Sequence, residues 1–88
     1  MIAVITSFAD DPARLALRPR HRELLAEMHE EGLLIAAGPF GDQSGALLLF
    51  ETDDVAEVKA AMARDPYYSA PGVSVVTIQP WTVVAGGL

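Results

Sequence analysis

The chain has 88 residues, a net charge of −6 and no cysteine, and 51% of its residues are hydrophobic. This length fits one domain, the lack of cysteine excludes disulfides and thiolate chemistry, and the acidic balance argues against binding to nucleic acid or an anionic membrane. So much apolar side chain in a short chain indicates that a second copy covers part of it.

The N-terminal segment lacks the basic start and the long apolar run of a signal peptide. No segment approaches the run of about 20 apolar residues that a membrane span requires. We therefore expect a cytoplasmic protein.

The first half of the chain predicts a strand, a helix and a hairpin. Met1–Ser7 is short and β-branched, which is typical of a strand. An Asp-Asp-Pro run then predicts that residues 8–17 form a connection or an irregular helical turn. A helix is expected over Pro19–Glu31, because proline suits the first turn of a helix, with Gly32 as its left-handed cap.

The next two elements are expected to form an antiparallel hairpin. Leu33–Ala37 is wholly apolar and precedes a Gly-Pro break, and Ala46–Glu51 follows a short polar turn. Two apolar runs joined by such a connection are typical of paired strands.

The last elements are a helix and a long strand. Asp54 and Glu57 predict a helix start that resembles a capping box, and Pro66 ends that helix. A strand is expected over Val73–Val84, at a sheet edge or with a bulge, because it contains Pro80. The tail at 85–88 is expected to be frayed.

The predicted order β-α-β-β-α-β is that of the split βαβ, or ferredoxin-like, α+β fold. It places two helices on one face of a four-stranded antiparallel sheet, in a single domain over residues 1–88. The strands lack a clean polar alternation, so the bare face is also apolar. We expect that face to pair with the same face of a second copy, which gives a dimeric α+β barrel.

His21 is the first candidate for chemistry. At about 100° per residue, it shares one stripe of the helix with Leu24, Leu25 and Met28. An imidazole facing inward must be hydrogen-bonded or used, and its ordinary pKa of about 6.5 suits proton transfer at neutral pH. A core histidine bonded to a backbone carbonyl has the same pattern.

Asp65 is the predicted partner of His21. Helical spacing places it near the inward direction of Val58, and a carboxylate is the usual group that orients a catalytic imidazole. Asp65 precedes Pro66, so a simple Asp-Pro turn is the alternative. The spacing of His21 and His29 is unlike that of a zinc pair, and we expect neither a metal nor a cofactor.

Further residues suit a small-molecule pocket. Gly38, Pro39 and Phe40 form a candidate rim, where backbone can approach a ligand closely, and Ser44 can donate a hydrogen bond; all four also suit a hairpin turn. Three arginines precede or flank His21, namely Arg14, Arg18 and Arg20. Such a cluster can hold a carboxylate, although arginines that balance surface glutamates give the same pattern.

Three motifs together resemble the YciI-like family over Ile2–Pro80. They are LRPRH ending at His21, GLLIAAGPF ending at Phe40, and Asp65-Pro66-Tyr67 followed by Gly72-Val73. The resemblance implies the dimeric ferredoxin-like barrel and an active-site His–Asp pair, which maps to His21 and Asp65. Arg18, Gly38, Pro39 and Tyr67 match the surrounding motif positions.

Proteins similar to this family include a dehalogenating enzyme and muconolactone isomerases. The chain departs from the family pattern at Arg22, where an apolar residue is common, and at Ala70-Pro71, beside the Asp65 loop. We therefore predict a small acid–base enzyme of the isomerase, lyase or dehalogenase type, with an anionic carbonyl or lactone substrate. In this prediction His21 moves the proton, Asp65 orients the imidazole of His21, and Arg18 holds an anionic group of the substrate.

Two other functions are compatible with the same sequence. One is a non-catalytic module that binds a small ligand or regulates an enzyme, and the other is a pure dimerisation domain. An RNA-binding module of this topology is disfavoured by the acidic charge and by strands that lack exposed aromatic pairs.

Overall fold

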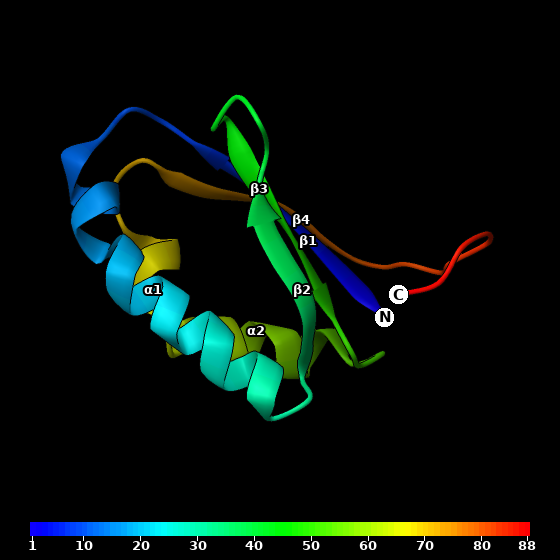
Figure 1. The fold of residues 1–88 in the computed structure, drawn as a ribbon. Helices are drawn as coiled ribbons and strands as arrows, with labels where there is room; N and C mark the ends of the chain where they lie inside the picture. The colour runs from blue at the N-terminus through cyan, green and yellow to red at the C-terminus, as the bar shows by residue number, and fades with distance from the viewer.

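The computed structural model describes residues 1–88 as a four-stranded antiparallel sheet with two helices on one side of it (Figure 1). The strand order is β2-β3-β1-β4, which is the ferredoxin-like arrangement that the sequence predicts. The elements are β1 (Ile2–Phe8), α1 (Pro12–Glu30), β2 (Leu34–Pro39), β3 (Gly45–Phe50), α2 (Val55–Ala63), the short 3-10 helix η1 (Pro66–Ser69) and β4 (Val73–Pro80).

Helix α1 begins seven residues earlier than the sequence suggests, at Pro12 instead of Pro19. Asp11 caps it by accepting a hydrogen bond from the Ala13 N–H at 2.8 Å, so the Asp-Pro pair starts the helix and does not interrupt it. Pro19 therefore lies inside the helix, at the cost of one backbone hydrogen bond. The predicted cap at the other end is confirmed, since Gly32 has φ +82°.

The two later helical segments differ in part from the prediction. Asp54 caps α2 as expected and accepts from the Ala56 N–H at 2.9 Å. The capping box is not completed, because the Glu57 carboxylate accepts from the Thr52 hydroxyl. The 3-10 helix η1 replaces the expected simple stop after α2.

Strand β4 lies at the edge of the sheet and has a register shift opposite Ile5 and Thr6. It ends at Pro80, four residues before the predicted end. Proline cannot continue the ladder, and the next N–H, of Trp81, donates to the Met1 carbonyl. The predicted hairpin of β2 and β3 is confirmed as an antiparallel pair.

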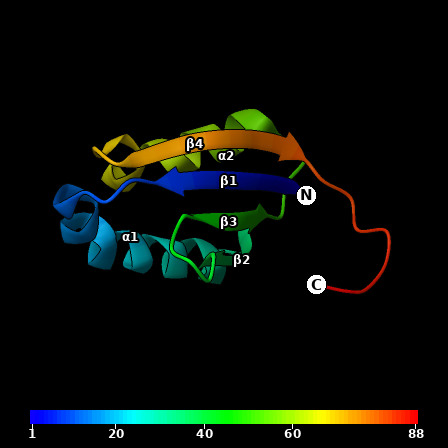
Figure 2. The ribbon, with the colours of Figure 1, turned by 90° about the horizontal axis from the view of Figure 1, so that it is seen from above.

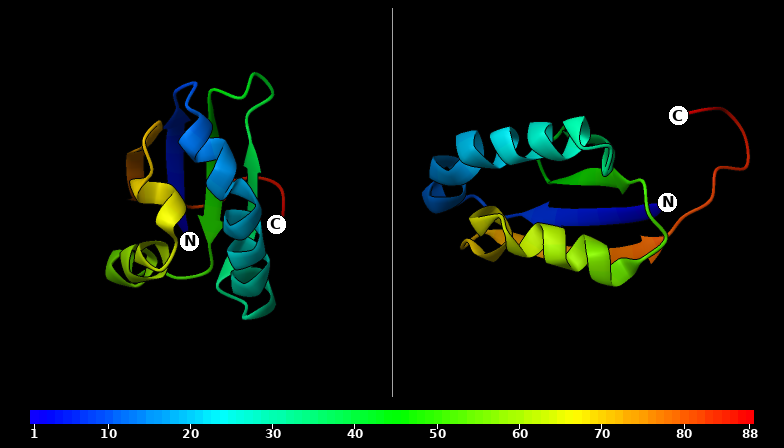
Figure 3. Two further views of the ribbon diagram at one scale, coloured as in Figure 1. Left: turned by 90° about the vertical axis from the view of Figure 1, so that its left-hand side faces the viewer. Right: turned by 90° about the horizontal axis from the view of Figure 1, so that it is seen from below.

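The core lies between the sheet and the two helices, which lie across the same sheet face (Figure 3). Alternate residues of β1 and β3 point into it, and α1 and α2 supply the opposite side: Ile2, Val4, Leu48 and Phe50, with Met28, Val58, Ala61 and Met62. Gly45 is required where β3 meets β1, because a Cβ there would lie 2.0 Å from the Thr6 carbonyl oxygen.

The opposite face of the sheet has no helix on it, as the views in Figures 1 and 2 show. Ile5 and Leu47 face each other across β1 and β3 on this side, beside Leu49. Leu47 is 37% exposed. The bare apolar face is thus present as predicted, while its pairing with a second copy remains a prediction. No helix of the chain has both the length and the apolar character needed to cross a bilayer.

Candidate functional site

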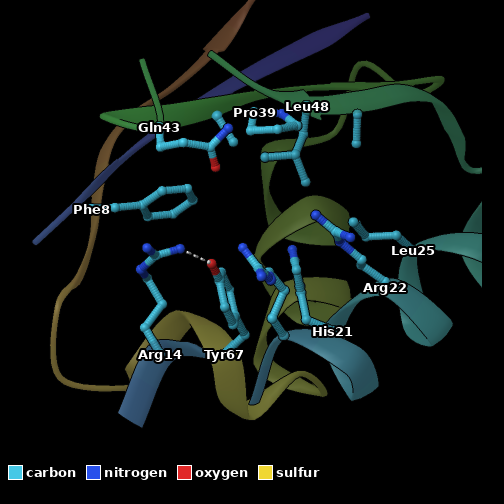
Figure 4. A pocket seen from close by; sticks show the side chains of 13 residues that line it. Phe8, Arg14, His21, Arg22, Leu25, Pro39, Gln43, Leu48 and Tyr67 are labelled. Atoms are coloured by element: carbon cyan, nitrogen blue, oxygen red, sulfur yellow. Dashed lines mark hydrogen bonds between the residues drawn. The ribbon is translucent and has the colours of Figure 1, made fainter. Parts of the chain in front are cut away.

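A cavity of about 330 Å³ lies between helix α1 and the strands β2 and β3. Its walls come from three places: the inward face of α1, the β2–β3 hairpin, and Phe8 and Tyr67 at one end (Figure 4). This volume is at the small end of the range for ligand-binding pockets. The cavity therefore suits a small molecule.

His21 lies in the wall of this cavity and is fixed by Asp65. The Nδ1 atom of His21 and Oδ2 of Asp65 are 2.6 Å apart, and both residues are buried. Since a carboxylate can only accept, Nδ1 carries the proton and donates it. In the neutral form of the ring this leaves Nε2 without a proton and able to accept one.

Asp65 serves two partners with its two oxygens. Oδ1 accepts from the Tyr67 N–H at 2.9 Å and so caps η1, while Oδ2 accepts from His21. From sequence, Asp65 could either form a simple turn or bind His21. In the structure its carboxylate does both. Because Pro66 removes Asp65 from helical geometry, the carboxylate turns back toward α1.

Two tyrosines hold the imidazole from other directions. The Tyr67 ring stacks on His21 with centroids 4.0 Å apart, and Tyr68 meets it edge-on at 5.3 Å. The Tyr68 hydroxyl is buried and has no hydrogen-bond partner. Burial, together with the negative charge of Asp65, raises the pKa of Tyr68 well above its ordinary value.

Three arginines on one face of α1 reach the cavity. Arg14, Arg18 and Arg22 recur every four residues, and all of them line it, whereas no aspartate or glutamate does. None of the three forms a salt bridge. Arg20 points elsewhere and pairs with Glu23. An acidic protein thus has a cavity with uncompensated positive charge, which favours an anionic ligand.

Arg14 is the most enclosed of these arginines, with 7% of its surface exposed. Its Nη1 donates to the Tyr67 hydroxyl at 3.2 Å (Figure 4), and its guanidinium lies 4.4 Å from the centre of the Phe8 ring. Its buried Nε has no partner.

The hairpin residues divide between the two faces of the sheet. Gly38 and Pro39 line the cavity, and their contact with a ligand stays a prediction. Phe40 does not line it. It comes directly after Pro39, and because successive side chains point to opposite faces, it lies with Leu47 in a groove on the outer face. Ser44 does not line it either, since its N–H donates to Asp42 in the turn. Hydrogen bonds from Ser44 lower the pKa of Asp42.

Sequence reasoning missed seven residues of the cavity wall: Phe8, Arg22, Leu25, Ala37, Gln43, Ala46 and Leu48. The four-residue spacing of Arg14, Arg18 and Arg22 was a usable signal, which the assumed helix start at Pro19 concealed. Gln43 gave no signal. It adopts φ +62° in the hairpin turn, and its side chain points into the cavity (Figure 4).

Comparison with known proteins agrees with the fold. The solved structure of 5-chloro-2-hydroxyhydroquinone dehydrochlorinase (TftG) from Burkholderia phenoliruptrix AC1100, in complex with 2,5-dihydroxybenzoquinone, matches with a TM-score of 0.62 and 17% sequence identity. The match covers 93% of this chain and 94% of that one. At this identity the likeness concerns the fold alone. No curated protein matches the sequence.

The family comparison is more specific than the structural one. The model of the YCII-related domain matches residues 1–82, which include both helices, all four strands and every residue of the cavity wall. The chain therefore belongs to the YCII-related domain family.

Proposed function

We propose that this protein is a small-molecule acid–base enzyme in which His21 moves a proton to or from a carbon next to a carbonyl group. The hydrogen bond of 2.6 Å between His21 and Asp65 supports this proposal most strongly. It fixes the tautomer in which Nε2 can act as a base, and it stabilises the imidazolium that forms. Isomerisation and elimination of a leaving group both begin with such a step.

The charges of the cavity support an anionic substrate. Arg18 and Arg22 line the cavity and have no carboxylate partner, so they are available to a carboxylate or an acidic hydroxyl of the substrate. The enzyme of similar fold, TftG, is a dehydrochlorinase and was solved with a dihydroxybenzoquinone. An acidic cyclic carbonyl compound is thus our proposed substrate class.

A hydrogen-exchange assay tests the proposal without knowledge of the natural product. A panel of small keto acids, lactones and cyclic enolic ketones is incubated with the protein in D2O, and loss of the proton next to the carbonyl is followed by NMR. We expect exchange of at least one member, and a fall of about 10²–10⁴-fold in His21→Asn.

His29 offers a matched control, because it is the other histidine of the chain and lies exposed near the end of the same helix. His29→Asn is expected to exchange at the rate of the unmodified protein. Equal rates in His21→Asn and the unmodified protein, with a substrate that is exchanged, contradict the proposed role of His21.

A further inference from the structure

Tyr67 and Arg14 form a donor unit that the proton transfer at His21 does not use. The Tyr67 hydroxyl accepts a hydrogen bond from Arg14, so its own proton must be directed elsewhere. No group of the protein accepts that proton. The Tyr67 ring extends from η1 with its hydroxyl toward Phe8 and Gln43, as Figure 4 shows.

Arg14, which donates to this hydroxyl, is a buried cation without a counterion. Arg14 is buried, has no acidic partner, and keeps one N–H without any acceptor. A buried cation without a counterion is unfavourable, and a negative charge arriving in the cavity relieves it. The face of the Phe8 ring compensates for part of this cost by a cation–π contact.

We infer that Tyr67, polarised by Arg14, is the site that receives the developing oxyanion of the substrate. This inference rests on the proposed function, since it concerns the second half of the same step. When the C–H bond next to the carbonyl breaks, its proton goes to Nε2 of His21. The bonding pair then forms a C=C bond and the carbonyl π pair moves onto oxygen, where the Tyr67 O–H donates to it.

The arrangement of the cavity makes the two roles compatible. Tyr67 stacks directly on His21, so its hydroxyl and the imidazole belong to one rigid unit. Arg14 reaches the oxygen of Tyr67 and acts through it, so Arg14 is a positioning residue, and Tyr67 is the catalytic residue that touches the oxyanion. Arg18 and Arg22 remain for a separate anionic group of the substrate.

A binding experiment with 4-nitrophenol tests this site independently of any reaction. The phenolate of this probe absorbs visible light and the phenol does not, so titration shows which form the protein prefers. We expect the unmodified protein to bind the phenolate at least tenfold more tightly than the phenol. Tyr67→Phe and Arg14→Met should abolish the preference, and Arg14→Lys should restore part of it.

One control variant distinguishes the Tyr67 site from the general charge of α1, and a separate readout distinguishes it from the proton transfer at His21. Arg20→Met removes the same charge from an exposed position of α1 and should leave the preference unchanged. Phenolate preference reports on Tyr67 and proton exchange reports on His21, so failure of the proposed function and failure of this inference give different results.

Three outcomes overturn the inference. The first is a preference that survives in Tyr67→Phe. The second is a preference that is lost equally in Arg20→Met, which assigns it to the general charge of α1. The third is the absence of phenolate binding by unmodified protein whose fold is confirmed by circular dichroism. If Tyr67→Phe fails to fold, Arg14→Met and Arg14→Lys decide the question.

Discussion

Tyr67 lies flat against His21, with ring centroids 4.0 Å apart and ring planes 10° from parallel. Tyr68 closes an edge of the same imidazole, and Asp65 holds its Nδ1. These contacts fix the ring position and leave Nε2 as the nitrogen that can change its proton. The histidine is thus held in advance in the orientation that the proposed proton transfer requires.

Replacing Asp65 by asparagine is expected to reverse the tautomer of His21. An amide has one oxygen, which the Tyr67 N–H already requires, so its NH2 group faces Nδ1 and moves the imidazole proton to Nε2. We expect a loss of about 10²–10⁴-fold in proton exchange. Measurement of the 15N chemical shifts of His21 shows directly which nitrogen carries the proton.

Asp54→Asn is the matched control, because Asp54 caps α2 at an exposed position and does not line the cavity. It should change neither the His21 shifts nor the exchange rate. If Asp65→Asn leaves the proton on Nδ1, the orienting role of Asp65 is wrong.

Tyr68→Phe is expected to stabilise the protein, or at least not to weaken it. The substitution removes a buried hydroxyl without a partner, and such a group costs about 1–3 kcal/mol. Urea unfolding at neutral pH should give an unfolding free energy equal to or higher than that of the unmodified protein. A decrease of more than 1 kcal/mol, taking that as about the net value of one hydrogen bond, indicates a partner for this hydroxyl in solution.

The same residue predicts how stability changes at alkaline pH. The raised pKa keeps Tyr68 protonated in the folded protein, while the unfolded chain releases its proton above a pKa of about 10. Stability from this group is therefore constant below about pH 10 and falls as pH rises further. In Tyr68→Phe the unfolding free energy should fall less steeply between pH 9 and 11, about one unit on each side of the unfolded-state pKa of tyrosine.

Gln43→Gly is expected to raise stability and weaken ligand binding together. Gln43 has φ +62°, a conformation that costs about 1–2 kcal/mol for a residue with a Cβ. Glycine removes this strain and also removes the amide that points into the cavity. Gln43→Ala is the control, because it loses the amide but keeps the strain, so it should weaken nitrophenolate binding without the gain in stability.

The bare face of the sheet is expected to hold two copies together. Leu47 is 37% exposed at the centre of that face, and Leu47→Asp should place a charge in the contact and shift the protein toward monomer in analytical ultracentrifugation. Leu15 is similarly exposed, at 42%, but lies on α1. Leu15→Asp should leave the association unchanged, and a monomeric unmodified protein contradicts the prediction.

The fold was predictable from sequence because its signals are local. Apolar runs with turn residues between them are enough to give four strands and their order along the chain, and Asp54 and Gly32 mark helix ends by simple stereochemistry. The start of α1 was predicted wrongly, because both Asp11-Pro12 and Pro19 resemble a helix start. The Asp11 cap and the hydrogen bond from Arg14 to Tyr67 hold the part of the helix that precedes the second proline.

The site was less predictable, because most of its wall comes from residues brought together by the fold. His21 and Asp65 stood out as ionisable groups on apolar faces, 44 residues apart. Gln43 and Phe8 are ordinary in sequence, and only the hairpin geometry and the entry into α1 turn them to the cavity. Phe40 and Ser44 were selected by their proximity to Gly38, but strand alternation and the turn direct them away.

The separation of charge between cavity and exterior has a kinetic consequence. Three of the six basic residues line the cavity, while twelve acidic residues are distributed over the rest of the chain. At 0.1 M salt an anion feels these charges only within about 10 Å, the screening length, so the acidic exterior repels it close to the surface and the arginines attract it at the cavity. Added salt should therefore speed entry while it shortens residence, and large polyanions, which cannot enter, meet only the repulsive exterior.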